Sequence, residues 1–229
     1  RVFMFILLYR LLGGILVKKI MFVGNSHTYF NDMPQMVREL FTCAGEPVSA
    51  AMLTHGGKTL DWHFHQEQTR FNILYGEYDF VVLQQAAHPF DGYQALSDGV
   101  SAIRGLAEGL PCQFVLYMTW AEKARPENQP EMSEAYIRTA KEQGTLLAPV
   151  GEIWQQFRKE HPERELYFTD GAHASPLGSF LAACCIFRAV SGGNLPETIQ
   201  QDKGVLGQLD ACALQEILDF VRKAQFPSK

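Results

Sequence analysis

The chain has 229 residues, of which 47% are apolar, and its formal net charge is −5. This length and apolar content predict a folded α/β domain with a sizeable core and argue against disorder. The acidic balance and the lack of a basic block argue against binding nucleic acid through its phosphates. The five cysteines are an odd number without paired metal-ligand spacing, which favours a reducing compartment over a disulfide framework.

Residues 1–17 form an almost wholly apolar stretch with Arg10 near its middle. The stretch is shorter than the ~20 apolar residues of a membrane helix, and it matches a signal peptide only loosely. We expect it to be an extension outside the fold: a signal remnant, an anchor or a translated upstream stretch. Residues 18–229 are then a single domain. A cytoplasmic location is favoured, and a secreted or anchored one is the alternative if the extension is a signal segment.

Short apolar runs alternate with amphipathic segments through the rest of the chain. This alternation predicts a parallel sheet with helices on both faces. Asp32 and Ser175 are candidate caps of the helices that follow them. Five strands are expected in residues 20–23, 48–53, 79–84, 113–119 and 145–150. Helices are expected in residues 33–44, 60–75, 93–110, 131–143, 151–159, 176–190 and 210–224.

A candidate nucleophile follows the first strand, in the turn Gly24-Asn25-Ser26. Glycine and asparagine tolerate the backbone angles of a sharp turn. Ser26 then lies just beyond the carboxyl end of a strand, the edge at which open parallel sheets bind ligands. Taken alone, the stretch is equally well explained as an ordinary turn, so the chain must also supply a base and oxyanion donors.

Asp170 and His173 could supply the base and the group that orients it. A carboxylate three residues before a histidine can hold one ring nitrogen and leave the other to accept a serine proton. A solvated loop with a helix-capping aspartate would explain the pair equally well.

Oxyanion donors are expected after the second and third strands. Gly57 lies in a glycine-rich loop, where a backbone N–H can approach a developing negative charge. Gln84 and Gln85 end a buried strand, where two amides require a partner or a substrate.

In this order, the motifs resemble those of the SGNH (GDSL-like) hydrolase superfamily over residues 18 to about 190, in particular an uncharacterised bacterial branch with glutamine in the third block. The resemblance implies a flavodoxin-like, three-layer α/β/α sandwich with a five-stranded parallel sheet. It also implies that Ser26 is the nucleophile, His173 the base and Asp170 its orienting partner. The backbone N–H groups of Ser26 and Gly57 would be oxyanion donors.

The chain departs from the family pattern at two positions. Asn25 replaces the usual aspartate before the nucleophile, and the usual Gly-x-Asn block after the third strand is absent. Some branches of the superfamily use a glutamine there, so Gln84 is the expected third oxyanion donor. Gln85 and then His88 are the alternatives.

Two further residues are expected to line the substrate cleft: His55, before the glycine loop, and Trp120, after the fourth strand. Metal ligation is not expected, because His63 and His65 would point to different faces of a helix. The combined prediction is a serine esterase without metal or organic cofactor. Its substrate would be a small-molecule ester with a small O-acyl group, acetyl first, and the alcohol could be a carbohydrate. The alternatives are a non-catalytic binding module of the same fold and a flavodoxin-like nucleotide binder.

Overall fold

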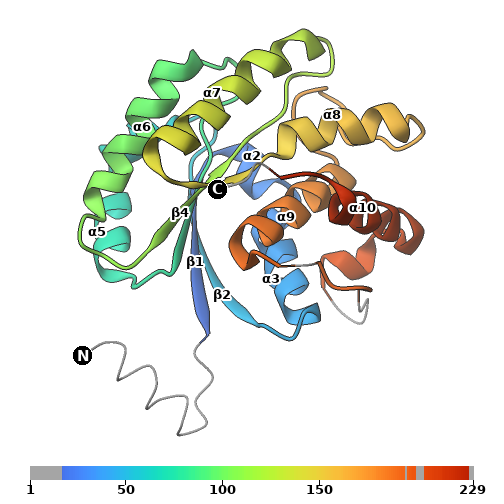
Figure 1. Cartoon of the computed structure of the whole chain (residues 1–229), viewed down its shortest axis with the longest axis horizontal. Helices are drawn as coiled ribbons and strands as arrows, with labels where there is room; N and C mark the ends of the chain where they lie inside the picture. Colours follow the sequence, from blue (N-terminus) through green and yellow to red (C-terminus); the bar gives the residue numbers. More distant parts are fainter. Residues whose placement is uncertain (1–16, 194, 200–203, 227–229) are drawn as a thin grey trace, which may run out of the picture.

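The computed structural model describes residues 17–193, 195–199 and 204–226, so the predicted extension lies almost wholly outside the described residues. Five parallel strands form one sheet in the order β2-β1-β3-β4-β5 (Figure 1). The strands are β1 (Lys18–Gly24), β2 (Val48–Thr54), β3 (Phe80–Leu83), β4 (Gln113–Tyr117) and β5 (Leu146–Ala148).

Helices cover both faces of the sheet because successive side chains of β1 point to opposite sides. Ile20 and Phe22 pack into one core, and Met21 and Val23 pack into the other. The first core is covered by α3 (Met33–Cys43), α8 (Val150–Glu160), α9 (Pro176–Ser191) and α10 (Ala211–Lys223). The second is covered by α4 (Leu60–Phe64), α5 (Glu67–Tyr75), α6 (Gly92–Leu106) and α7 (Gln129–Gln143). The predicted three-layer α/β/α architecture is confirmed.

Local geometry corrects some of the predicted boundaries. The segment expected as one helix over residues 60–75 is two helices, because Gln66 adopts an extended conformation that begins α5 anew. Asp32 does not cap α3: its φ is 54° and its side chain makes no capping bond. Ser175 does cap α9, since its hydroxyl accepts from the Gly178 N–H. None of the described helices has the length and apolar content that crossing a membrane requires.

The strand register brings three loops to one edge of the sheet. Gly24 at the end of β1 pairs with Thr54 on β2, and Val23 pairs with Leu83 on β3. Because all strands are parallel, the segments that follow them leave the sheet on the same side. The turn with Ser26, the glycine loop and the segment after β3 therefore start close together.

Candidate active site

The turn after β1 holds Ser26 at the start of the short helix α2 (Ser26–Tyr29). Gly24 is required by close approach: a Cβ there would lie 2.5 Å from the Thr28 hydroxyl and 2.6 Å from the Gln84 amide oxygen. The Asn25 side chain caps α2 by accepting from the His27 N–H (3.1 Å). The turn therefore fixes the position of the Ser26 hydroxyl.

The loop before α9 brings the predicted base to this hydroxyl. His173 Nε2 lies 2.8 Å from Ser26 Oγ, and His173 Nδ1 lies 2.6 Å from Asp170 Oδ2. The other oxygen of Asp170 accepts the backbone N–H groups of Ala172 and His173, each at 2.9 Å. These contacts form a continuous serine–histidine–aspartate chain, the arrangement that activates a serine for nucleophilic attack.

Asp170 is held in its ionised form. Partial burial alone would raise its pKa, but hydrogen bonds from the Ala172 N–H, the His173 side chain and the His173 N–H prevail and lower the pKa to about 2. A carboxyl whose pKa is depressed on folding stabilises the fold above its unfolded pKa, and this contribution is lost as the pH falls through the folded value. The carboxylate is therefore available to orient the imidazole throughout the neutral range.

Aromatic rings hold the imidazole of His173 on both faces. The Phe30 ring stacks on the His173 ring with centroids 4.3 Å apart, and the His27 ring stacks on the His173 ring with centroids 4.9 Å apart. Trp120 supports the same loop, because its indole N–H donates to the Ala172 carbonyl at 2.9 Å. Trp120 has no exposed surface and stacks on Trp154 at 3.9 Å. This corrects the expectation that Trp120 forms a wall of the substrate cleft. Trp120 is buried, and its indole N–H holds the loop that carries Asp170 and His173.

The two glutamines after β3 are used inside the protein. The Gln84 amide oxygen accepts the Asn25 N–H (2.8 Å) and the Thr28 hydroxyl (2.9 Å), and its NH₂ donates to the Gln85 carbonyl. The Gln85 amide oxygen accepts from the N–H groups of Leu60 and Ala86. Both side chains are buried. These contacts argue against the predicted role of Gln84 as an oxyanion donor, and they assign it to holding the nucleophile turn instead.

His88 and His27 carry buried nitrogens with no internal partner. The Nε2 atoms of both rings lack a hydrogen-bond partner among the described residues, and the ring centroids are 5.1 Å apart. Burial, reinforced by His88 and His173, lowers the pKa of His27 to about 3. Burial also lowers the pKa of His88. Both imidazoles are therefore neutral near pH 7, and each can present one N–H or one lone pair.

The glycine loop is tied to the nucleophile turn by Asn25. Its side-chain NH₂ donates to the Lys58 carbonyl at 3.1 Å, a bond that an aspartate could not make. Gly57 has a φ of +69°, in the left-handed region that favours glycine, and no hydrogen bond within the described residues uses its N–H. His55 is exposed beside Trp62, with ring centroids 4.7 Å apart, so its substrate contact stays a prediction.

Comparison with known proteins places this geometry in context. No protein-family model and no curated protein matches the chain. A DUF4886 family protein from Bacteroides uniformis ATCC 8492 is 18% identical, with a TM-score of 0.69 over 90% of this chain and 93% of that one. A proposed GDSL-like lipase from Parabacteroides merdae ATCC 43184 is 16% identical, with a TM-score of 0.57 over 78% and 98%. The psychrotrophic esterase EstA from Pseudoalteromonas sp., inhibited by monoethylphosphonate, is 9% identical, with a TM-score of 0.58 over 76% and 97%.

The chain has the fold of the SGNH hydrolases. At these identities the likeness concerns the fold, so the chemistry must be argued from the residues of this chain. At the sheet edge, the turn with Ser26 after β1 lies between the glycine loop after β2 and the segment after β3.

Sequence reasoning missed several residues that support the candidate active site. His63 lies on α4, is buried, and places Nε2 2.7 Å from the Gly24 carbonyl at the end of β1. Phe30 and His27 hold the ring of His173, and Thr28 bonds Gln84. Only His27 left a signal in the sequence, since it directly follows the candidate nucleophile. The contacts of Phe30 and His63 join segments far apart in the chain.

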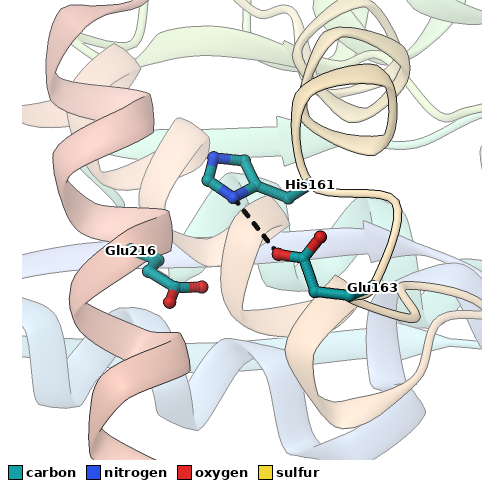
Figure 2. Close-up of side chains that lie close together, drawn as sticks. All are labelled: His161, Glu163 and Glu216. Atoms are coloured by element: carbon teal, nitrogen blue, oxygen red, sulfur yellow. Dashed lines mark ion pairs between the residues drawn. The ribbon is translucent and has the colours of Figure 1, made fainter.

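A second cluster of titratable side chains lies away from the candidate active site. Figure 2 shows Glu216 on α10 opposite His161 and Glu163, which follow α8. Their ligand atoms lie within 4.8 Å of one another, and His161 Nδ1 is 3.6 Å from a Glu163 oxygen. Arg164 already donates two hydrogen bonds to Glu216, at 2.7 and 2.8 Å. We interpret this cluster as an ion-pair network that fastens α10 to the loop after α8.

Proposed function

We propose that this protein is a serine esterase. The observation that carries the proposal is the chain of contacts from Ser26 Oγ through His173 to Asp170, at 2.8 and 2.6 Å. An imidazole that is oriented by a carboxylate and bonded to a serine hydroxyl is suited to proton removal from that hydroxyl. The SGNH fold, shared with an esterase and a proposed lipase, supports the same reaction class.

The reaction would take two steps. His173 Nε2 removes the proton of Ser26 Oγ as the oxygen attacks the acyl carbon, and it then gives this proton to the leaving alcohol. Water, activated by the same imidazole, next attacks the acyl-enzyme and releases the acid and free Ser26. Asp170 stays ionised throughout and stabilises the imidazolium that forms in each step.

The oxyanion would be held by backbone and side-chain donors. The Ser26 N–H opens α2, where the first N–H groups of a helix have no internal partner, and Gly57 leaves its N–H unused. Because Gln84 and Gln85 are occupied, we assign the third donor to His88. Its neutral ring and its unpartnered, buried Nε2 support this assignment.

We extend the proposal to esters with a small acyl group, acetyl first, on a hydroxylated alcohol such as a carbohydrate. The motif resemblance supports the small acyl group. The polar side chains of Glu122, Arg125 and Asn128, which line a cavity together with His88, support the hydroxylated alcohol.

Hydrolysis of p-nitrophenyl acetate tests the reaction class. We expect the wild-type protein to hydrolyse it and Ser26→Ala to lower kcat by about 10³-fold or more, because the nucleophile is lost. Ser101→Ala, an exposed serine on α6, is the matched control and should keep full activity. A folded wild-type protein without activity would support the binding-module alternative. Activity that survives in Ser26→Ala would place the nucleophile elsewhere.

A further inference from the structure

A polar cavity of about 550 Å³ lies beside the candidate active site. One wall is formed by residues 87–90 in the segment after β3. The other is formed by the segment after β4 together with the start of α7. Its lining includes an imidazole, three charged side chains and an amide, which are His88, Glu122, Arg125, Glu131 and Asn128.

The cavity and the serine–histidine–aspartate chain share their supports. His88 lines the cavity, and its ring lies 5.1 Å from that of His27, which stacks on His173. On the opposite wall, the Lys123 N–H donates to the Gly171 carbonyl at 2.8 Å. The segment that carries Glu122 and Arg125 is thereby bonded to the loop that carries Asp170 and His173. Both walls of the cavity are therefore linked to His173, one through His27 and the other through the loop that carries the base.

The charged groups of this cavity are not neutralised by neighbours. Glu122, Arg125 and Glu131 take part in none of the ion pairs formed among the described residues. Their side chains also make no hydrogen bond within that part of the chain. A long aliphatic chain would strip water from these groups without replacing its hydrogen bonds, which is costly. A hydroxyl group can both donate and accept, and so can satisfy carboxylates and a guanidinium alike.

We propose that this cavity binds the alcohol part of the ester, and that this alcohol is a sugar or another polyol. The inference rests on the proposed esterase function. It follows from the chemistry of the base, since His173 must protonate the leaving oxygen, which places the alcohol on the His173 side of the acyl carbon. Arg125, Glu122 and Asn128 then bond its hydroxyls.

Two acetyl esters with different alcohols test the inference: 6-O-acetylglucose, followed by acetate release in a pH-stat, and p-nitrophenyl acetate. Arg125→Ala should raise KM for 6-O-acetylglucose about tenfold or more, because a charged hydrogen bond to the sugar is lost. Its kcat/KM for p-nitrophenyl acetate should fall much less, because the p-nitrophenyl group has no hydroxyl groups for the cavity to bond. An unchanged far-UV circular dichroism spectrum shows that the variant is folded. Glu122→Gln should show the same selective change.

The matched control is Lys141→Ala, an exposed cation on α7 outside this cavity, which should change neither substrate. Unchanged KM for 6-O-acetylglucose in both cavity variants would overturn the inference, and so would equal losses on the two substrates. Absence of p-nitrophenyl acetate hydrolysis by the wild-type protein would instead overturn the proposed esterase function itself. The two failures are therefore distinguishable.

Discussion

The side chains of Gln84, Gln85 and His88 follow β3, and they differ in how many hydrogen bonds they make within the protein. The Gln84 amide oxygen accepts hydrogen bonds from Asn25 and Thr28, and its NH₂ donates to the Gln85 carbonyl. His88 keeps a buried nitrogen free. A donor that stabilises an oxyanion must be free before substrate binds, because breaking an internal bond would cancel the gain. At the residue scale, this difference separates a structural side chain from a candidate for the oxyanion hole.

Paired variants check this separation. Gln84→Ala should lower the free energy of unfolding by about 2–4 kcal/mol, because it leaves buried donors and acceptors unpaired. His88→Ala should lower kcat by about 10²-fold or more and change stability far less, as removal of an oxyanion donor does. Urea unfolding and p-nitrophenyl acetate kinetics measure the two effects. A stable Gln84→Ala protein with a large loss of kcat would return Gln84 to the oxyanion hole.

The loop between α8 and α9 is the element that positions the base. An isolated bridge between Tyr167 and Ala174 closes it, and the Phe168 N–H donates to the His173 carbonyl at 2.8 Å. The Trp120 indole N–H also donates to the Ala172 carbonyl of this loop. These bonds hold the loop without regular secondary structure, with His173 Nε2 2.8 Å from Ser26 Oγ.

Trp120→Phe should loosen this loop while keeping the stacked ring. We expect kcat to fall by about tenfold through the misplaced imidazole, with little change in KM, since about one net hydrogen bond is lost. Trp154→Phe is the matched control, because the indole N–H of Trp154 has no partner among the described residues. It should leave kcat near the wild-type value. Equal losses in the two variants would show that packing alone, rather than the bond to Ala172, holds the loop.

At the scale of the whole molecule, two buried histidines and the half-buried His88 link stability to pH. Burial is the largest cause that lowers the pKa of His27, His63 and His88. A histidine with a lowered folded pKa binds its proton more readily in the unfolded chain, so acidification favours unfolding. This loss begins as the pH falls below the ordinary histidine pKa of about 6.5 and, for His27, continues to about 3.

Urea unfolding between pH 7 and pH 4 measures this linkage. The free energy of unfolding should fall with decreasing pH, by about 1.4 kcal/mol per pH unit for each extra proton that the unfolded chain binds. His27→Phe keeps an aromatic ring against His173 and removes one titrating group, so its slope should be smaller by about one proton. A slope unchanged by this substitution would show that His27 is protonated alike in both states.

The sheet was predictable because each strand carries its own signal. Burial on both faces of a parallel sheet requires a continuous apolar run, and residues 20–23 show one. The cap at Ser175 was equally local. The break between α4 and α5 was not predicted, because no proline or glycine marks it within residues 60–75. The burial of Trp120 was missed for a related reason, since its stacking partner Trp154 lies far along the chain.

The sequence alone determined which predicted strand each motif follows. It also determined the candidates Ser26, Asp170 and His173, because residue type and position along the chain are properties of the sequence. Only the tertiary structure decided which polar groups remain free to act. Gln84 and His88 are four residues apart and both are polar. The Gln84 amide oxygen accepts hydrogen bonds from the turn between β1 and α2, whereas His88 Nε2 has no partner among the described residues. Hydrogen-bond partners are set by contacts between distant segments, and these exist only in the folded molecule.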